Sequence, residues 1–260
     1  NQRASGSWPT SVYVYVPPVS TQKAIFGYGY NGSTVVSMTN LVSNTGVVAS
    51  DTAGVGTARY YLAAAGYGGD KAIFGYGYGA ANSLTNLVSN TGVVATDTTG
   101  VGTARYALAA AGYGGDKAIF GYGYTNALGA TVSMTNLVSN TGVVATDTTG
   151  VGTARTELAS AGYGTDKAIF GYGTTGANVS MTNLVSNTGV VSTDTTGVGT
   201  ARTALAAARY GSDKAIFGYG YVAGPVSITN LVSNTGVVAT DTTGVGTARN
   251  VLAAAGYSTS

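Results

Sequence analysis

The side chains that could carry out chemistry in this sequence are few, and most of them recur at regular spacing. Only 12 Lys and Arg and 10 Asp and Glu occur in 260 residues. All of them except Arg3, Glu157 and Arg209 occupy equivalent places in a repeated unit. Each unit carries one Arg after a Gly-Thr-Ala run and one Asp before a Thr-rich turn: Arg59, Arg105, Arg155, Arg202 and Arg249, with Asp51, Asp97, Asp147, Asp194 and Asp241.

A charge that is kept in every copy of a charge-poor chain is expected to hold structure. We therefore expect the repeated arginines to donate hydrogen bonds to loop carbonyls or to a neighbouring Asp between units. The alternative is a ring of guanidinium groups around a central axis, which would hold an anion.

Most catalytic machinery is absent from the composition. The sequence has no Cys and no His, which excludes thiol and imidazole nucleophiles, zinc sites built from these residues, and disulfides. Each Asp-Thr turn offers one carboxylate, too few for a tight calcium site. Glu157 has no sequence-neighbouring acid for a glycosidase pair, and no Lys-Ser/Thr follows the Gly-Tyr-Gly-Tyr runs as a phosphate loop requires. We expect no enzyme, no metal site and no cofactor.

The charge balance also limits the partners. A net charge of +2 without a local Lys/Arg cluster gives no footprint for nucleic acid. No apolar run reaches the 18 or so residues that span a bilayer, so we expect no membrane insertion. Because 44% of the residues are hydrophobic, the chain has enough apolar surface for a core.

The elements that position these residues come from one unit written five times. The phrase Lys-Ala-Ile-Phe-Gly-Tyr-Gly begins at Lys23, Lys71, Lys117, Lys167 and Lys214. One unit contains short apolar runs at 62–67, 71–78, 84–88 and 93–96, separated by turn sequences such as Gly68-Gly69-Asp70. These runs predict a four-stranded antiparallel meander. We expect a strand and not a helix at the Ala triplet 63–65, because the run is short and Gly66 follows at once.

Repeats of this length and strand content are typical of propeller blades. We predict an all-β, five-bladed β-propeller over 23–260, preceded by a leader at 1–22. Residues 252–257 would supply the strand missing beside 23–30, closing the ring and removing two open sheet edges. The alternative is an open solenoid of stacked sheets. The repeated phenylalanines should be buried between adjacent blades: Phe26, Phe74, Phe120, Phe170 and Phe217.

The order of motifs within a unit resembles a kelch-type propeller repeat. Arg105 precedes the strand at 108–113, then Gly-Gly-Asp, then the strand that runs into glycines at Gly121 and Gly123. Tyr122 splits the glycine pair, and Leu137 and Val143 replace the later Tyr and Trp of the family. The amino-acid sequence of the repeat is also similar to that of proteins encoded by tailed phages and environmental viruses. The first resemblance implies blade architecture, and the second implies a place on a virion.

Positions that differ between the copies point to a binding face. Length and identity change at 30–38, 78–84, 124–134, 174–181 and 221–228, and identity changes again just after each Arg. In an up-and-down meander, the connection between the second and third strands and the connection between the fourth strand and the next first strand emerge on the same side. Tyr, Asn and Thr in such loops suit contact with glycans or proteins, although exposed loops also vary without a function. The candidate face comprises Tyr30, Asn31, Tyr60, Tyr61, Tyr78, Asn82, Tyr106, Tyr124, Asn126, Thr156, Glu157, Thr174, Asn178, Tyr221 and Asn250.

The leader carries an alternating run at 11–16, with Trp8 just upstream. This pattern predicts a strand for which a five-blade meander has no place, so we expect residues 7–16, with Trp8, Tyr13 and Tyr15, to attach the chain to another virion or surface protein. The sequence thus favours a non-enzymatic structural or receptor-binding module on the outside of a virus particle (phage tail, fibre or capsid) or of a cell. The alternative is an extracellular lectin with one similar sugar site per blade.

Overall fold

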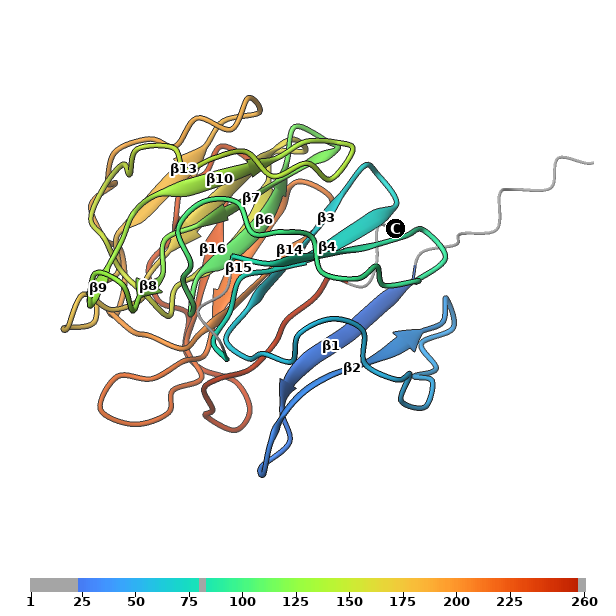
Figure 1. The fold of residues 1–260 in the computed structure, drawn as a ribbon. Helices are drawn as coiled ribbons and strands as arrows, with labels where there is room; N and C mark the ends of the chain where they lie inside the picture. Colours follow the sequence, from blue (N-terminus) through green and yellow to red (C-terminus); the bar gives the residue numbers. More distant parts are fainter. Residues whose placement is uncertain (1–22, 80–82, 257–260) are drawn as a thin grey trace, which may run out of the picture.

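The computed structural model describes residues 23–79 and 83–256. Within these ranges every regular element is a β-strand and no helix occurs (Figure 1). The strand at 11–16 predicted for the leader lies outside the described residues.

The strands form five small antiparallel sheets, one for each sequence unit, which we number sheet 1 to sheet 5. Sheet 1 has two strands, β1 (Ala24–Tyr30) and β2 (Val35–Val42). Each later sheet has three: β3 (Ala63–Tyr67), β4 (Lys71–Gly75) and β5 (Thr85–Val88); β6 (Ala109–Tyr113), β7 (Lys117–Gly121) and β10 (Thr135–Val138); β11 (Ala159–Tyr163), β12 (Lys167–Gly171) and β13 (Thr182–Val185); β14 (Ala206–Tyr210), β15 (Lys214–Gly218) and β16 (Thr229–Val232). A short ribbon of β8 (Tyr124–Thr125) and β9 (Ala130–Thr131) extends the loop after β7.

Glycine pairs set the register of the first hairpin in sheets 2 and 3. Tyr67 pairs with Lys71 across a three-residue loop, Gly68-Gly69-Asp70, in which the two glycines have φ angles of 61° and 80°. Glycine adopts positive φ without the steric cost that other residues incur, so it suits a tight hairpin loop. The Ala triplet therefore enters β3 as a strand, as the sequence predicts.

The fourth apolar run of each unit does not form a regular strand in the described residues. In sheet 2 it makes isolated bridges between Val88 and Val94 and between Thr85 and Thr98. The buried Asn86 side chain donates a hydrogen bond from Nδ2 to Ala95 O at 3.1 Å. In a regular strand, this carbonyl would accept from the backbone of a neighbouring strand. The units predicted to have four strands form sheets of two or three strands with a bridged outer segment in the described residues.

Successive sheets pack face to face, and the core lies between them. The central strand of each sheet points Ile toward the following sheet and Phe toward the preceding one. Ile73 and Phe120 meet between sheets 2 and 3, and the same pairing recurs between sheets 3 and 4 and between sheets 4 and 5. Phe74, Phe120, Phe170 and Phe217 are at most 5% exposed, as predicted.

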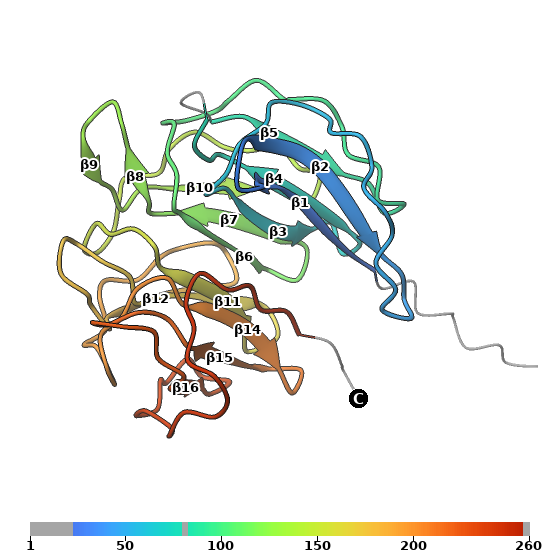
Figure 2. The ribbon, with the colours of Figure 1, turned by 90° about the horizontal axis from the view of Figure 1, so that it is seen from below.

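The prediction that Phe26 is buried is wrong for this structure, in which its side chain is 57% exposed. Phe26 points away from sheet 2, and the described residues contain no sheet packed on that side. Figure 2 shows the sheets following one another in an arc from β1 to β14–β16. β1 pairs with β2 alone, and residues 252–256 form no regular strand. The described residues therefore form an arc of stacked sheets without a closed sheet.

Candidate functional site

Four of the five repeated arginines lie buried between successive sheets: Arg59, Arg105, Arg155 and Arg202. The fifth, Arg249, is exposed. Arg155 donates from Nε to Tyr172 O at 2.9 Å, from Nη1 to Thr153 O at 3.1 Å and from Nη2 to Asn183 Oδ1 at 2.7 Å. Its guanidinium group also covers the ring of Tyr122 in the preceding sheet, 4.3 Å from the ring centre. The side chains of Arg59, Arg105 and Arg155 have no exposed surface, so these guanidinium groups offer nothing to an anion in solution.

The tyrosines that pack against these guanidinium groups, Tyr76, Tyr122 and Tyr172, are also buried. The hydroxyl group of Tyr76 donates to Val101 O, and that of Tyr122 donates to Val151 O. Burial raises the pKa of Tyr76, Tyr122 and Tyr172 to about 12, although the neighbouring Arg partly opposes the shift.

The repeated aspartates hold loops and have few oxygens left for a ligand. Asp194 accepts hydrogen bonds from Asn183 Nδ2 at 2.9 Å and from Thr153 Oγ1 at 2.6 Å. Burial alone would raise the pKa of Asp194, but these hydrogen bonds outweigh it and hold the pKa below its usual value. Asp97, Asp147 and Asp241 make the same contacts, whereas Asp51 receives a bond from Asn40 at 2.8 Å. No group of three or more acidic residues that could hold a metal ion occurs in the described part.

Four buried asparagines, which were not predicted from the sequence, join an Arg to an Asp: Asn86, Asn136, Asn183 and Asn230, all with no exposed surface. Each uses its amide oxygen to accept from Arg and its amide nitrogen to donate to Asp. A signal was present, because an Asn that recurs inside an otherwise apolar strand must be paired when that strand is buried.

The variable positions come together at one end of the sheets. In four units, the residue after the repeated Arg pairs with a residue of the variable loop through mutual backbone hydrogen bonds, as between Tyr60 and Tyr78. The other pairs are Tyr106 with Tyr124, Thr156 with Thr174, and Thr203 with Tyr221. Both sets of variable positions therefore lie side by side. The hairpins at Gly68 and its equivalents occupy the opposite end of the first strand of each three-stranded sheet, which we call the inner strand: β3, β6, β11 and β14.

Six aromatic side chains on this face form a continuous surface that we call the tyrosine cluster: Tyr30, Tyr60, Tyr61, Tyr78, Tyr106 and Tyr124. Tyr106 lies at its centre, 5.0 Å from Tyr78 and 5.4 Å from Tyr124 between ring centres. Tyr30, Tyr61 and Tyr78 are 59%, 51% and 39% exposed, so their rings remain available to a partner. Burial and, secondarily, the neighbouring phenols raise the pKa of Tyr106.

Next to the cluster, Asn126 contributes with Tyr78 and Tyr106 to a small cavity of about 40 Å³. Asn31 accepts hydrogen bonds from the backbone of Ser33 and Thr34 and shapes its own turn. The predicted residues Asn82, Trp8, Tyr13 and Tyr15 lie outside the described residues.

The rest of the face, on sheets 4 and 5, is mostly polar, and several of its side chains form hydrogen bonds within the chain. Glu157 accepts a hydrogen bond from Thr203 Oγ1 at 2.8 Å, and Asn178 donates to Tyr221 O at 3.1 Å. Thr156 and Thr174 are half-buried. Asn250 is also half-buried, close to the end of the described chain. Tyr221 on sheet 5 is 39% exposed, as much as Tyr78. The rings that contact one another on this face belong to sheets 1 to 3 among the described residues.

A chain of backbone hydrogen bonds runs under this face from unit to unit. Ala107 N donates to Tyr61 O, Glu157 N to Ala107 O, Ala204 N to Glu157 O, and Val251 N to Ala204 O, at 2.9 to 3.1 Å. All of these residues have φ between 50° and 53°, a left-handed conformation that is unusual outside glycine. The links use main-chain atoms, so they do not depend on side-chain identity.

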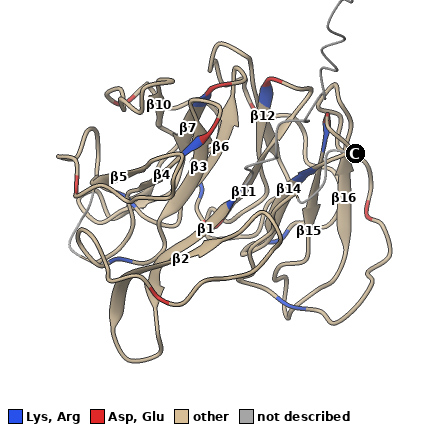
Figure 3. Cartoon of the chain, turned by 90° about the vertical axis from the view of Figure 1, so that its right-hand side faces the viewer, with Lys and Arg blue, Asp and Glu red and all other residues tan. Residues whose placement is uncertain are grey.

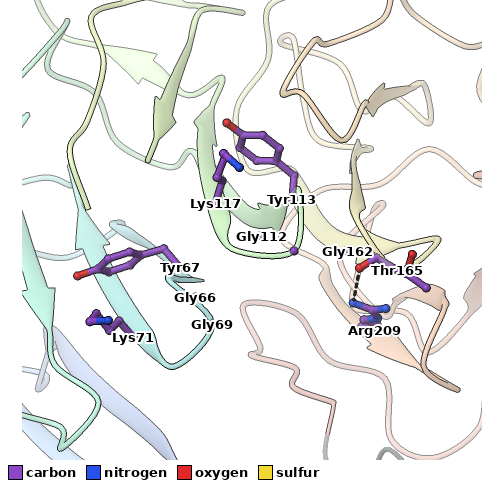
Figure 4. Close-up of a pocket in the computed structure, with 11 residues that line it drawn as sticks. Gly66, Tyr67, Gly69, Lys71, Gly112, Tyr113, Lys117, Gly162, Thr165 and Arg209 are labelled. Atoms are coloured by element: carbon purple, nitrogen blue, oxygen red, sulfur yellow. Dashed lines mark hydrogen bonds between the residues drawn. The ribbon is translucent and has the colours of Figure 1, made fainter. Parts of the chain in front are cut away.

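A second hollow, of about 290 Å³, opens at the hairpin end of the inner strands (Figure 4). Gly66, Gly112 and Gly162 line it at equivalent positions, and Arg209 takes the next equivalent place. Arg209 donates to the backbone carbonyls of Thr165 and Ser212, and the lining Lys71 and Lys117 pair with Asp70 and Asp116. The basic groups of the hollow are therefore already partnered within the chain.

Acidic and basic residues are sparse along the ribbon in Figure 3, with long uncharged stretches between them. In the described ranges, no helix is long and apolar enough to cross a membrane.

No protein-family model and no curated protein matches this chain. The resemblance to kelch-type repeats stays a prediction, and the function has to be inferred from the geometry of the chain itself.

Proposed function

We propose that this chain is a non-enzymatic binding module that presents the tyrosine cluster to a receptor, glycan or protein, on a cell or virion surface. Its finer architecture in this proposal is a closed five-bladed β-propeller, kelch-like in the order of its motifs. The leader attaches the disc to a surface or virion protein.

The tyrosine cluster carries this proposal. Tyr rings provide a large, rigid contact area with a hydroxyl group at the edge, which suits the faces of sugar rings and the apolar patches of proteins. Exposed aromatic surface that is rimmed by polar residues is typical of an interaction site. The repeated charged residues are occupied within the fold, which supports a role in structure for them.

The distribution of the aromatic side chains favours a single binding site in the chain, and not a similar site in every blade. Positions equivalent to Tyr60 and Tyr106 hold Thr156 and Thr203 in later units. A lectin with similar sites in every unit would need similar side chains at these positions. We therefore expect one ligand per chain, centred on Tyr106.

The test compares ligand binding by the full chain and by Tyr106→Thr. Threonine occurs naturally at the equivalent position of two other units, so this change removes the central ring without an unfamiliar residue. Glycan arrays and cell-binding assays identify the ligand, and calorimetry gives its stoichiometry. We expect a loss of affinity of about fivefold or more, since stacking on an aromatic ring contributes about 1 kcal/mol or more.

Thr165→Gly is the matched control, because it introduces the residue found at Gly69 and Gly115 and lies at the opposite end of the sheets. It should bind like the parent chain. Equal binding by Tyr106→Thr would contradict the proposed site, and a stoichiometry of one ligand per repeat unit would favour the lectin.

A further inference from the structure

The junctions between successive sheets repeat the same interlocking contacts. At the junction of sheets 2 and 3, the ring of Phe120 packs on Gly75 and meets Tyr76 edge-on at 5.2 Å. Arg105 covers Tyr76 at 4.3 Å and donates to Asn136 in sheet 3. The other three junctions repeat the glycine, tyrosine and arginine contacts.

The outer face of sheet 5 carries one half of such a junction. Arg249 covers Tyr219 at 4.0 Å, but its side chain is exposed and donates to Thr247 O in its own loop. At Gly218, a Cβ atom would meet Thr229 alone, whereas at the equivalent Gly171 it would collide with Phe217. Leu231 is 41% exposed on this side.

The outer face of sheet 1 carries the complementary half. Phe26 is exposed where the other phenylalanines fill the space over a glycine of the preceding sheet. Asn40 already donates to Asp51 at 2.8 Å, just as Asn86 donates to Asp97 at 2.9 Å. Gly46 has open space around it, whereas its equivalent Gly92 packs against a leucine of the preceding sheet.

The chain that follows sheet 5 runs beside β14, in the place that the next inner strand would take. Val251 N donates to Ala204 O at 2.9 Å, continuing the backbone links between earlier units. Gly256 lies against the carbonyl of Arg209, just as Gly112 lies against that of Gly66. Sheet 1, in turn, has no inner strand in the described residues.

We propose that these two faces bind each other within one chain and form a fifth junction. Phe26 then packs on Gly218 and Tyr219, Leu231 packs on Gly46, and Arg249 donates to Asn40 Oδ1 and Tyr28 O. Thr247 donates to Asp51, and residues 253–256 pair with β1 in the register in which Ala63 pairs with Gly75.

Each outer face carries one half of the contacts seen in the four observed junctions, so the face that fits each of them is the other one. The two faces belong to one arc, so contact between them is intramolecular and does not depend on protein concentration, unlike contact with a second copy. Pairing also removes an open strand edge on β1. This inference deepens the propeller part of the proposed function by naming the residues that close the ring.

The first test compares two phenylalanines that stand at equivalent positions. Phe120→Ala creates a cavity in an observed junction and lowers the denaturant midpoint. If the fifth junction forms, Phe26→Ala lowers the midpoint by a similar amount, within a factor of about two. A midpoint unchanged by Phe26→Ala, beside a clear loss for Phe120→Ala, would overturn the proposal.

The second test uses disulfides, which is convenient because the sequence has no Cys. In an observed junction, Thr57 Oγ1 and Asp97 Oδ2 are 2.7 Å apart, so Thr57→Cys with Asp97→Cys is the positive control. Thr247→Cys with Asp51→Cys probes the fifth junction at the equivalent pair. We expect a monomer with an internal disulfide, identified by mass spectrometry and non-reducing gels.

Disulfide-linked dimers would show that a second copy occupies the faces, and free thiols beside an oxidised control would show that the faces stay apart. Either result overturns closure within one chain. Neither result bears on the tyrosine cluster, because ligand binding by the Tyr106→Thr variant is measured separately.

Discussion

Replacing Arg155 by Met removes a buried guanidinium group while keeping much of the side-chain length. The change leaves Tyr172 O, Thr153 O and Asn183 Oδ1 without their donors and uncovers the ring of Tyr122. A hydrogen bond to a charged group contributes about 1.5 to 3 kcal/mol, but the sum of three overstates the loss because the cost of burying the charge disappears too. Breaking a buried pair at one partner costs about 3 to 5 kcal/mol, and we expect that loss here.

Urea unfolding followed by far-ultraviolet circular dichroism measures this effect as a change in the free energy of unfolding. Arg209→Gly is the control, since it introduces the residue that the other four units carry at this place and should change stability by about 1 kcal/mol or less. If Arg155→Met loses less than about 1 kcal/mol, Arg155 does not hold sheets 3 and 4 together and the reasoning about the repeated arginines fails.

Three further outcomes follow from the same contacts. Because burial raises the pKa of Tyr76, Tyr122 and Tyr172 to about 12 and unfolded tyrosine titrates near 10, their stabilisation is present below about pH 10 and is lost as the pH rises toward 12. Unfolding free energies measured across this range should fall, and a flat profile would contradict the burial. Asp194 has a lowered pKa, so its stabilisation is present above about pH 4 and is lost in more acidic solution; Asp194→Asn should reduce the acid sensitivity seen in denaturation curves, and an unchanged pH profile would argue against it. Ala107→Gly should be neutral or stabilising by up to about 1 kcal/mol, because Ala107 has a φ of 50°, whereas Ala109→Gly in β6 should destabilise; equal losses on thermal melting would refute the strain.

The sequence was sufficient to predict antiparallel hairpins, because Gly68-Gly69 between apolar runs leaves the backbone few alternatives. It also predicted the burial of four phenylalanines from their alternation with isoleucine. The outer strand was not predictable from apolar content, since Asn86 competes with the backbone for Ala95 O. Phe26 shows a second limit: its position in the repeat is the same as that of Phe74, and its exposure depends on which sheet packs beside it.

The six tyrosines of the cluster could be named from the sequence, but the contacts among them could not. Comparing the copies located the variable positions, and the pairing of Tyr60 with Tyr78 explains why they meet. The contact between Tyr61 and Tyr106, 6.3 Å apart in neighbouring units, needed the distance between sheets, which sequence spacing does not contain.

The main-chain links beneath the variable face have a consequence for protein engineering. Residues 61, 107, 157, 204 and 251 are Tyr, Ala, Glu, Ala and Val, and they share one backbone conformation and one pattern of hydrogen bonds. Since the framework is secured by amide groups, the outward side chains at these positions can be randomised together in a display library. Selection from such a library would yield new recognition surfaces on an unchanged frame, in the way that hypervariable loops diversify on a conserved immunoglobulin sandwich.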